Sequence, residues 1–163
     1  MRLRIITCAA VLTAIGIAVA CSDSTSPTVS GTTYIATMNG ANERPTPNTS
    51  TATGTATYVL TGNSLSYTIT VSGLTAPATG AHLHAGSAAV AGPIIVPYTV
   101  SSTQSGTVTT GTIDLSFPVV CGNGCTVTGD SVKVLLNNGN AYANVHNSAA
   151  FPGGEIRGQL IRQ

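Results

Sequence analysis

The residues of this sequence best suited to chemistry are its three histidines. His82 and His84 lie two positions apart, so in an extended strand both imidazoles point to the same side and can reach one ion. His146 would add a third nitrogen ligand, and Glu155 could add an oxygen. Ligand sets of this kind suit zinc and copper. One interpretation is therefore a metal site in which His82, His84 and His146 bind Zn or Cu as the cofactor.

Further polar side chains alternate around the last histidine. Asn144 and His146 fall on one face of an extended segment, and Glu155 and Arg157 share one face of the next segment. Only 7% of the residues are charged, so this concentration is unusual for the chain. A second interpretation is structural: a buried Arg157 would pair with a carboxylate and with loop carbonyl groups, within a hydrogen-bonded network. We prefer this interpretation, which needs no cofactor, and keep the metal site as the alternative.

Catalysis finds little support in the sequence. No serine lies in a Gly-x-Ser-x-Gly turn, and no phosphate-binding loop occurs. Glu155 has no second acidic residue in its segment with which to share acid–base work. Copper/zinc superoxide dismutase also carries a His-x-His pair on strands, but it needs more histidines for two metals than this chain has. We therefore expect that the protein is not an enzyme, and a hydrolase is the least favoured function.

Strands must hold these side chains, and the composition agrees. Aromatic residues make up 4% and Trp is absent, while Thr, Ser, Gly and Ala dominate, which favours short strands joined by tight turns. The clearest strand is Ser64–Ser72, where apolar and hydroxyl residues alternate. Asp130–Leu136 fits either a strand or a short helix capped by Asp130 or Ser131, and Phe151–Gly154 predicts the turn between the last two strands. The other strands are expected at Tyr34–Met38, Gly54–Leu60, Ala81–Ala85, Ile94–Val100 (at an edge, because of its prolines), Gly111–Phe117, Tyr142–His146 and Glu155–Leu160.

The first 20 residues form a different kind of sequence. Two arginines precede an apolar run that ends in Ala18-Val19-Ala20, directly before Cys21. This order predicts a lipoprotein signal peptide over residues 1–20 and a lipid on Cys21, although Leu is more usual than Ala at position 18. The alternative is an ordinary secretory signal that leaves Cys21 free. Residues 21–31, rich in Ser and Thr, would form a flexible tether, and residues 32–163 one domain.

An exported lipoprotein would work at the cell envelope, and at the outer membrane if the host has one, because Ser22 follows Cys21. In that oxidising compartment Cys121 and Cys125 are expected to form a local disulfide, with a reduced pair as the alternative. The net charge of +1 and the lack of a basic stripe give no support for nucleic acid as a partner. The expected partners are the membrane, through the lipid, and an envelope or extracellular protein or matrix.

Four motifs follow one another along the chain: His82-Leu83-His84-Ala85-Gly86, Gly92-Pro93-Ile94, Gly139-Asn140-Ala141-Tyr142-Ala143-Asn144-Val145-His146 and Pro152-Gly153-Gly154-Glu155-Ile156-Arg157-Gly158-Gln159-Leu160. Their order and spacing resemble the CHRD domain, a family named for its repeats in chordin and common in bacterial secreted proteins. The departures are Ala143, where Val is usual, and Asn147, where Thr is usual. The resemblance covers residues 32–162 and implies an all-β, antiparallel sandwich or barrel-like domain of immunoglobulin-like kind, with Asp130–Leu136 as a short helix. It implies no settled activity, so the expected function is a non-catalytic binding or structural module.

Overall fold

The computed structural model describes residues 30–147 and 150–163. The expected signal peptide, Cys21 and most of the tether lie outside these residues. The strands between Thr32 and Arg162 enclose one hydrophobic core. Within the described residues, no helix has the length and the apolar character needed to cross a membrane.

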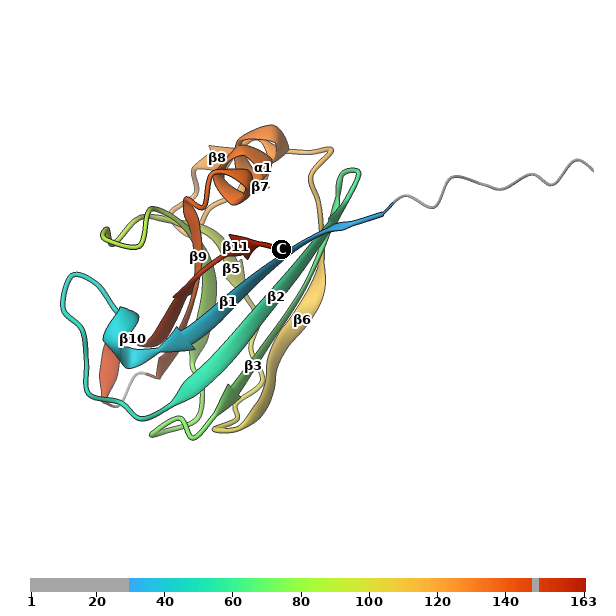
Figure 1. Ribbon diagram of the computed structural model, residues 1–163. Coiled ribbons are helices and arrows are strands. Elements are labelled where there is room, and N and C mark those ends of the chain that lie inside the picture. The colour runs from blue at the N-terminus through green and yellow to red at the C-terminus, as the bar shows by residue number, and fades with distance from the viewer. Residues whose placement is uncertain (1–29, 148–149) are drawn as a thin grey trace, which may run out of the picture.

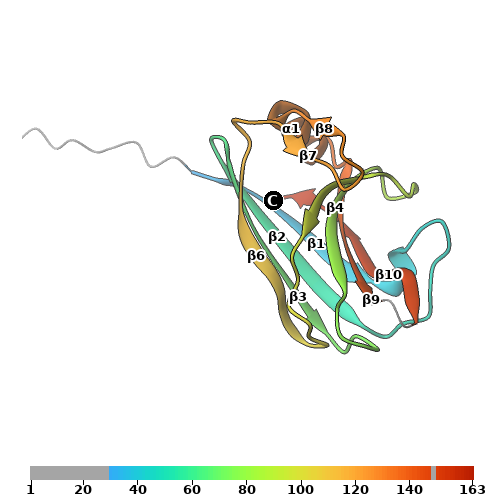
Figure 2. The same ribbon diagram turned by 180° about the vertical axis from the view of Figure 1, so that it is seen from behind.

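Nine strands form one antiparallel sheet that curves into a nearly closed barrel (Figure 1 and Figure 2). The order along the sheet is β5-β4-β9-β10-β1-β2-β3-β6, and β11 also pairs with β1. The backbone N–H of Ser101, after β5, donates to the carbonyl of Val108 in β6 at 2.7 Å, so the two edges of the sheet approach each other. The expected all-β fold is therefore confirmed, in its barrel-like form. The strands are β1 (Thr32–Asn39), β2 (Thr53–Thr61), β3 (Ser64–Ser72), β4 (Gly80–Ala85), β5 (Ile94–Tyr98), β6 (Gly106–Asp114), β9 (Ala141–Asn147), β10 (Phe151–Gln159) and β11 (Ile161–Arg162), with β7 (Val119–Val120) and β8 (Thr126–Val127) in a separate pair.

The alternation along β3 shows why the core lies inside the barrel. Leu65 and Ile69 are fully buried, whereas Ser66 and Thr68 between them are exposed. Successive side chains of a strand point to opposite faces, so apolar residues line the inside and hydroxyl residues face outward. A tight turn with Gly62 at a φ of +60° joins β2 to β3, and the predicted strand Ser64–Ser72 is confirmed at both ends.

One short helix, α1 (Gly129–Asn137), lies with β7 and β8 at one end of the barrel (Figure 1). The helix that the CHRD resemblance implies is therefore confirmed, but its predicted cap is wrong. The cap is Thr128, whose hydroxyl accepts a hydrogen bond from the N–H of Ser131 at 3.2 Å. The helix begins before Asp130, so the Thr128 hydroxyl is the group that reaches the free N–H groups of the first turn.

The strand expected at Gly111–Phe117 has different bounds in the structure. β6 runs from Gly106 to Asp114, so it begins and ends earlier than predicted. Its pairing with β3 shifts register between Ile69 and Thr70. At the other end, the N–H of Leu115 bonds to the carbonyl of Asn63, the residue just before β3, so β6 ends where its partner strand begins.

The turn predicted at Phe151–Gly154 is also wrong. These residues belong to β10, and Phe151 already pairs with Asn147 of β9. The register then shifts before Ile156 resumes the pairing, so the Pro-Gly-Gly sequence forms an irregular bulge within the strand. Proline and glycine are typical of bulges as well as of turns, and the local sequence does not distinguish the two.

Candidate metal centre

Most of the polar side chains identified in the sequence lie on the outer face of β4, β9 and β10. In the sheet His82 is opposite Asn144, and Asn144 is opposite Arg157, so one polar row crosses the three strands. The residues between them, such as Leu83 and Ala143, point inward and belong to the core. We call this surface the polar face; it is defined by His82, His84, Tyr142, Asn144, His146, Arg157 and Gln159. Glu155 lies next to the register shift of β10 and bonds instead to Asn147, which is on the inward side of β9.

Two loops cover the polar face. The loop 40–52, which begins with the short helix η1 (Gly40–Asn42), lies against β10, and its Asn48 side-chain amide donates to the carbonyl of Glu155 at 3.0 Å. The loop 86–93 supplies the carbonyls of Ser87 and Val90, which accept hydrogen bonds from Arg157 Nη2 at 2.8 and 2.9 Å. Arg157 is only 2% exposed and Asn144 only 3%, so a face outside the barrel is as buried as the core.

The three histidines converge at one point of this face. One potential ligand nitrogen from each of His82, His84 and His146 lies within 4.8 Å of the other two. His82 and His84 come from β4 and His146 from the adjacent β9, and the imidazole rings of His82 and His146 are 4.8 Å apart, centre to centre. No cysteine or carboxylate within residues 30–147 and 150–163 joins this group.

Hydrogen bonds fix which nitrogen of two of these rings is free. His84 Nδ1 is 3.0 Å from the carbonyl oxygen of Gly92, and His146 Nδ1 is 3.2 Å from that of Pro152. A carbonyl oxygen only accepts, so each neutral ring carries its proton on Nδ1 and has a lone pair on Nε2. His84 Nε2, His146 Nε2 and His82 Nδ1 are all buried, and none has a hydrogen-bond partner among the described residues.

The surroundings keep these imidazoles neutral. Burial, together with the neighbouring His146 and His84, lowers the pKa of His82 to about 4. Burial also lowers the pKa of His84 to about 4, against the raising effect of its bond to Gly92, and burial lowers the pKa of His146. Neutral imidazole is the form that binds metal ions, so at neutral pH no proton must leave before an ion binds.

A stack of three groups stands behind His84. Its imidazole lies against the Tyr142 ring, with centres 4.6 Å apart and planes 11° from parallel. The guanidinium carbon of Arg157 lies 3.5 Å from the centre of the same Tyr142 ring. The Tyr142 hydroxyl bonds to the backbone of Gly92, whose carbonyl also holds His84 Nδ1. The position of the His84 imidazole is therefore set by a tyrosine and a buried cation.

Glu155 and Glu43 have their own partners. Glu155 accepts hydrogen bonds from the Ser50 hydroxyl at 2.7 Å, from the Thr75 N–H at 2.9 Å and from the Asn147 side-chain amide. Glu43 accepts from the Asn144 amide at 2.7 Å. Burial raises the pKa of Glu43 to about 7, against the lowering effect of Arg157 and of the Asn144 bond.

Two sequence-based expectations for the polar face are corrected by this geometry. Glu155 was a candidate ligand, but it lies outside the histidine group because its oxygens are taken by Ser50, Thr75 and Asn147. Arg157 was expected to pair with a carboxylate; it bonds to loop carbonyls as expected, but the only ion pair among the described residues joins Lys133 and Asp130.

Glu43, which bonds to Asn144, and Asn147, which bonds to Glu155, are the residues that the sequence did not reveal. Glu43 lies in a loop 101 positions from its partner Asn144, and no local pattern marks it. Asn147 had a weak signal, because it replaces the Thr usual in the resemblance, and its amide bonds to Glu155 and to Thr75.

The two remaining cysteines lie apart from the polar face. Cys121 and Cys125 form the expected disulfide, in the connection between β7 and β8. They are therefore not available as metal ligands.

Comparison with known families gives one match, to the family described as the CHRD domain, over residues 34–160. That span is most of the chain. The chain belongs to the CHRD domain family. No curated protein matches it, and no solved structure does. The CHRD domain match begins in β1 and ends just after β10, so it contains the three histidines and both covering loops.

Proposed function

We propose that this CHRD domain is a non-catalytic metal-binding module that holds one Zn or Cu ion on His82, His84 and His146. One observation carries the proposal: a potential ligand nitrogen from each of the three rings lies within 4.8 Å of the other two, and each ring has a buried nitrogen without a hydrogen-bond partner among the described residues. Leaving a buried polar atom unpaired costs roughly 1–3 kcal/mol, and a fold that does so three times at one point is explained by a ligand. Asn144, the polar residue between them in the sheet, does not serve as a partner, because its side-chain amide donates to Glu43.

The size of the gap suits a transition-metal ion. Three atoms no more than 4.8 Å apart all lie within about 2.8 Å of one point, which is 4.8 Å divided by the square root of three. Zinc binds imidazole nitrogen at about 2.0–2.1 Å, so each ring must move inward by less than about 1 Å. The bonds from Nδ1 to the carbonyls of Gly92 and Pro152 would orient His84 and His146, as outer hydrogen bonds do in known metal sites.

Metal content of the full chain tests this function. The chain is purified in mild detergent without a polyhistidine tag, loaded separately with Zn and Cu, passed through gel filtration and analysed for metal. We expect one ion per chain, and loss of that ion in each of His82→Ala, His84→Ala and His146→Ala. These three are all the histidines of the chain. Thr68→Ala, on the exposed side of β3, is the control variant and should retain the ion. Wild-type chain that leaves the column without metal, or histidine variants that keep it, would end the proposal.

We further propose that the module is held at the cell envelope by a lipid on Cys21. The basic start, apolar run and small-residue exit before Cys21 support this, and the disulfide between Cys121 and Cys125 suits an oxidising compartment. In its native host a Cys21→Ser variant should move from the membrane fraction to the soluble fraction. A variant that stays with the membrane after a high-salt wash would contradict the lipid anchor.

A binding partner in the envelope, an extracellular protein or matrix, is part of the same proposal. Cross-linking in the host, with the His84→Ala variant beside the unmodified chain, would show whether a partner recognises the metal-loaded face. Equal capture by both chains would place the partner surface elsewhere.

A further inference from the structure

We propose that the histidine site is built for a monovalent copper ion, Cu(I), in preference to the divalent ions Zn(II) and Cu(II). This rests on the proposed function and adds the charge of the ion. Three features of the polar face carry it: a neutral ligand set, the absence of an anion at the site and a fixed cation behind one ligand.

The ligand set brings no negative charge to the ion. His82, His84 and His146 are neutral imidazoles, and no carboxylate or thiolate among the described residues joins them. The two buried acids have other partners: Glu155 is held by Ser50, Thr75 and Asn147, and Glu43 by Asn144. A bound Zn(II) or Cu(II) would therefore keep both of its charges, whereas Cu(I) would keep one.

Burial makes that difference matter. The three free nitrogens are inaccessible to solvent, and His84 is buried within the polar face. The cost of moving an ion from water into a poorly polarisable medium rises with the square of its charge, so a divalent ion pays about four times what a monovalent ion pays.

A permanent positive charge adds to this bias. The Arg157 guanidinium lies 3.5 Å from the centre of the Tyr142 ring, and that ring stacks on the His84 imidazole at 4.6 Å. The carbonyls of Ser87 and Val90 fix the guanidinium there, and Arg157 has no ion-pair partner among the described residues. Its repulsion acts twice as strongly on a divalent ion as on a monovalent one.

Cu(I) is the monovalent ion that fits these ligands. Alkali cations bind oxygen, whereas copper binds imidazole, and the site offers three nitrogens and no oxygen. Three ligands also satisfy Cu(I), while Zn(II) sites in proteins are almost always completed to four. No electron transfer is part of the proposal, which concerns the charge of the ion that is held.

Separate titrations of the metal-free full chain with Zn(II), Cu(II) and Cu(I), each against a competing chelator of known affinity, test this. Cu(I) is supplied as its acetonitrile complex without oxygen. We expect Cu(I) to bind at least about 100-fold more tightly than either divalent ion. If none of the three ions binds, the proposed function fails and this inference fails with it. If Zn(II) or Cu(II) binds as tightly as Cu(I), only this inference fails.

A charge variant tests the cause. Arg157→Leu removes the cation, and Arg157→Lys keeps it as the matched control. The preference for Cu(I) over Zn(II) should narrow by about tenfold in Arg157→Leu and stay near the wild-type ratio in Arg157→Lys. A folded Arg157→Leu chain with an unchanged ratio would overturn the role of the cation. If that variant does not fold, the three titrations of the unmodified chain still decide the inference.

Discussion

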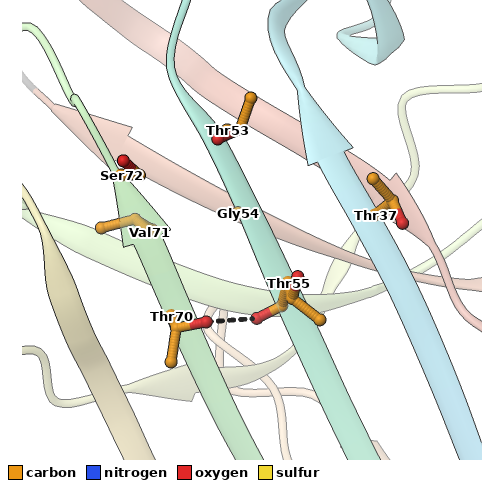
Figure 3. A pocket seen from close by; sticks show the side chains of 7 residues that line it. All are labelled: Thr37, Thr53, Gly54, Thr55, Thr70, Val71 and Ser72. Carbon is orange, nitrogen blue, oxygen red and sulfur yellow. Dashed lines mark hydrogen bonds between the residues drawn. The ribbon is translucent and has the colours of Figure 1, made fainter.

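The outer surface of the barrel differs between its two halves. On β1, β2, β3 and β6 it carries threonine and serine side chains, most of them exposed, as in the shallow hollow formed by Thr37, Thr53, Thr55, Thr70 and Ser72 (Figure 3). On β4, β9 and β10 it carries the histidines, Asn144 and Arg157, and loops bury it. The same strand alternation produced both surfaces.

What separates the two halves is their cover, because strand geometry is common to both. The loop 40–52 and the loop 86–93 bond directly to the polar face. Among the described residues, no such loop covers the outer side of β1, β2, β3 and β6. Side chains there form bonds such as Thr68 to Thr110 at 3.0 Å, which water could replace. A polar group in water loses little when its partner is removed, and a buried one loses much. The two halves should therefore respond very differently to equivalent substitutions.

The largest difference in the free energy of unfolding should come from comparing a buried arginine of the polar face with an exposed arginine elsewhere. Arg157→Ala removes a buried charge together with its bonds to Ser87 and Val90 and its stack on Tyr142, and should lower the free energy of unfolding by about 3 kcal/mol or more. The control is Arg162→Ala, an exposed arginine on β11, which should change it by less than about 0.5 kcal/mol. Urea unfolding measures both. Equal losses would mean that the polar face is no more buried in solution than β11.

Two adjacent glycines test how tightly the polar face is packed. A Cβ at Gly154 would overlap the Asn144 amide and the Glu43 carboxylate, and its φ of +130° disfavours any other residue, so Gly154→Ala should cost about 2 kcal/mol or more. A Cβ at Gly153 meets nothing, so Gly153→Ala should cost less than about 0.5 kcal/mol. Thermal unfolding compares the two. A tolerated Gly154→Ala would show that Glu43 and Asn144 do not meet there.

The pH dependence of stability tests the burial of Glu43. Its pKa is raised to about 7 in the folded protein from 4.5, so between these values the folded chain holds a proton that the unfolded chain has released. Stability should therefore fall by roughly 2–3 kcal/mol as pH rises from 4.5 to 7, relative to a Glu43→Gln variant. The histidines titrate in both chains, so the difference between the two metal-free curves isolates Glu43. Parallel curves would place this carboxylate in water.

The smallest effect belongs to the exposed half. Thr68→Val combined with Thr110→Val keeps the shape of two exposed side chains on β3 and β6, and removes their hydrogen bond together with the bond from the Thr110 hydroxyl to the Tyr67 carbonyl. The free energy of unfolding should change by less than about 0.5 kcal/mol, because exposed hydroxyl groups bond about equally well to water in the unfolded chain. Chemical denaturation of the double variant checks this. A loss above about 1.5 kcal/mol would erase the contrast between the halves.

The sequence predicted the parts of this molecule that local patterns determine. The alternation of Ser64–Ser72 fixed β3 at both ends, and the His-x-His spacing put two imidazoles on one side of β4. It could not show that the polar face is buried, because alternation separates the core side from the other side and says nothing about which loops cover the latter. Glu43 was missed for this reason, since its loop reaches Asn144 across 101 positions.

X-ray absorption at the metal edge of the loaded full chain shows directly whether His82, His84 and His146 bind one ion, because it counts the imidazoles around that ion. We predict three imidazole nitrogens at about 2.0 Å, with no sulfur and no carboxylate oxygen from the chain. A shell of oxygens, or one with a single imidazole, would contradict a site made of His82, His84 and His146.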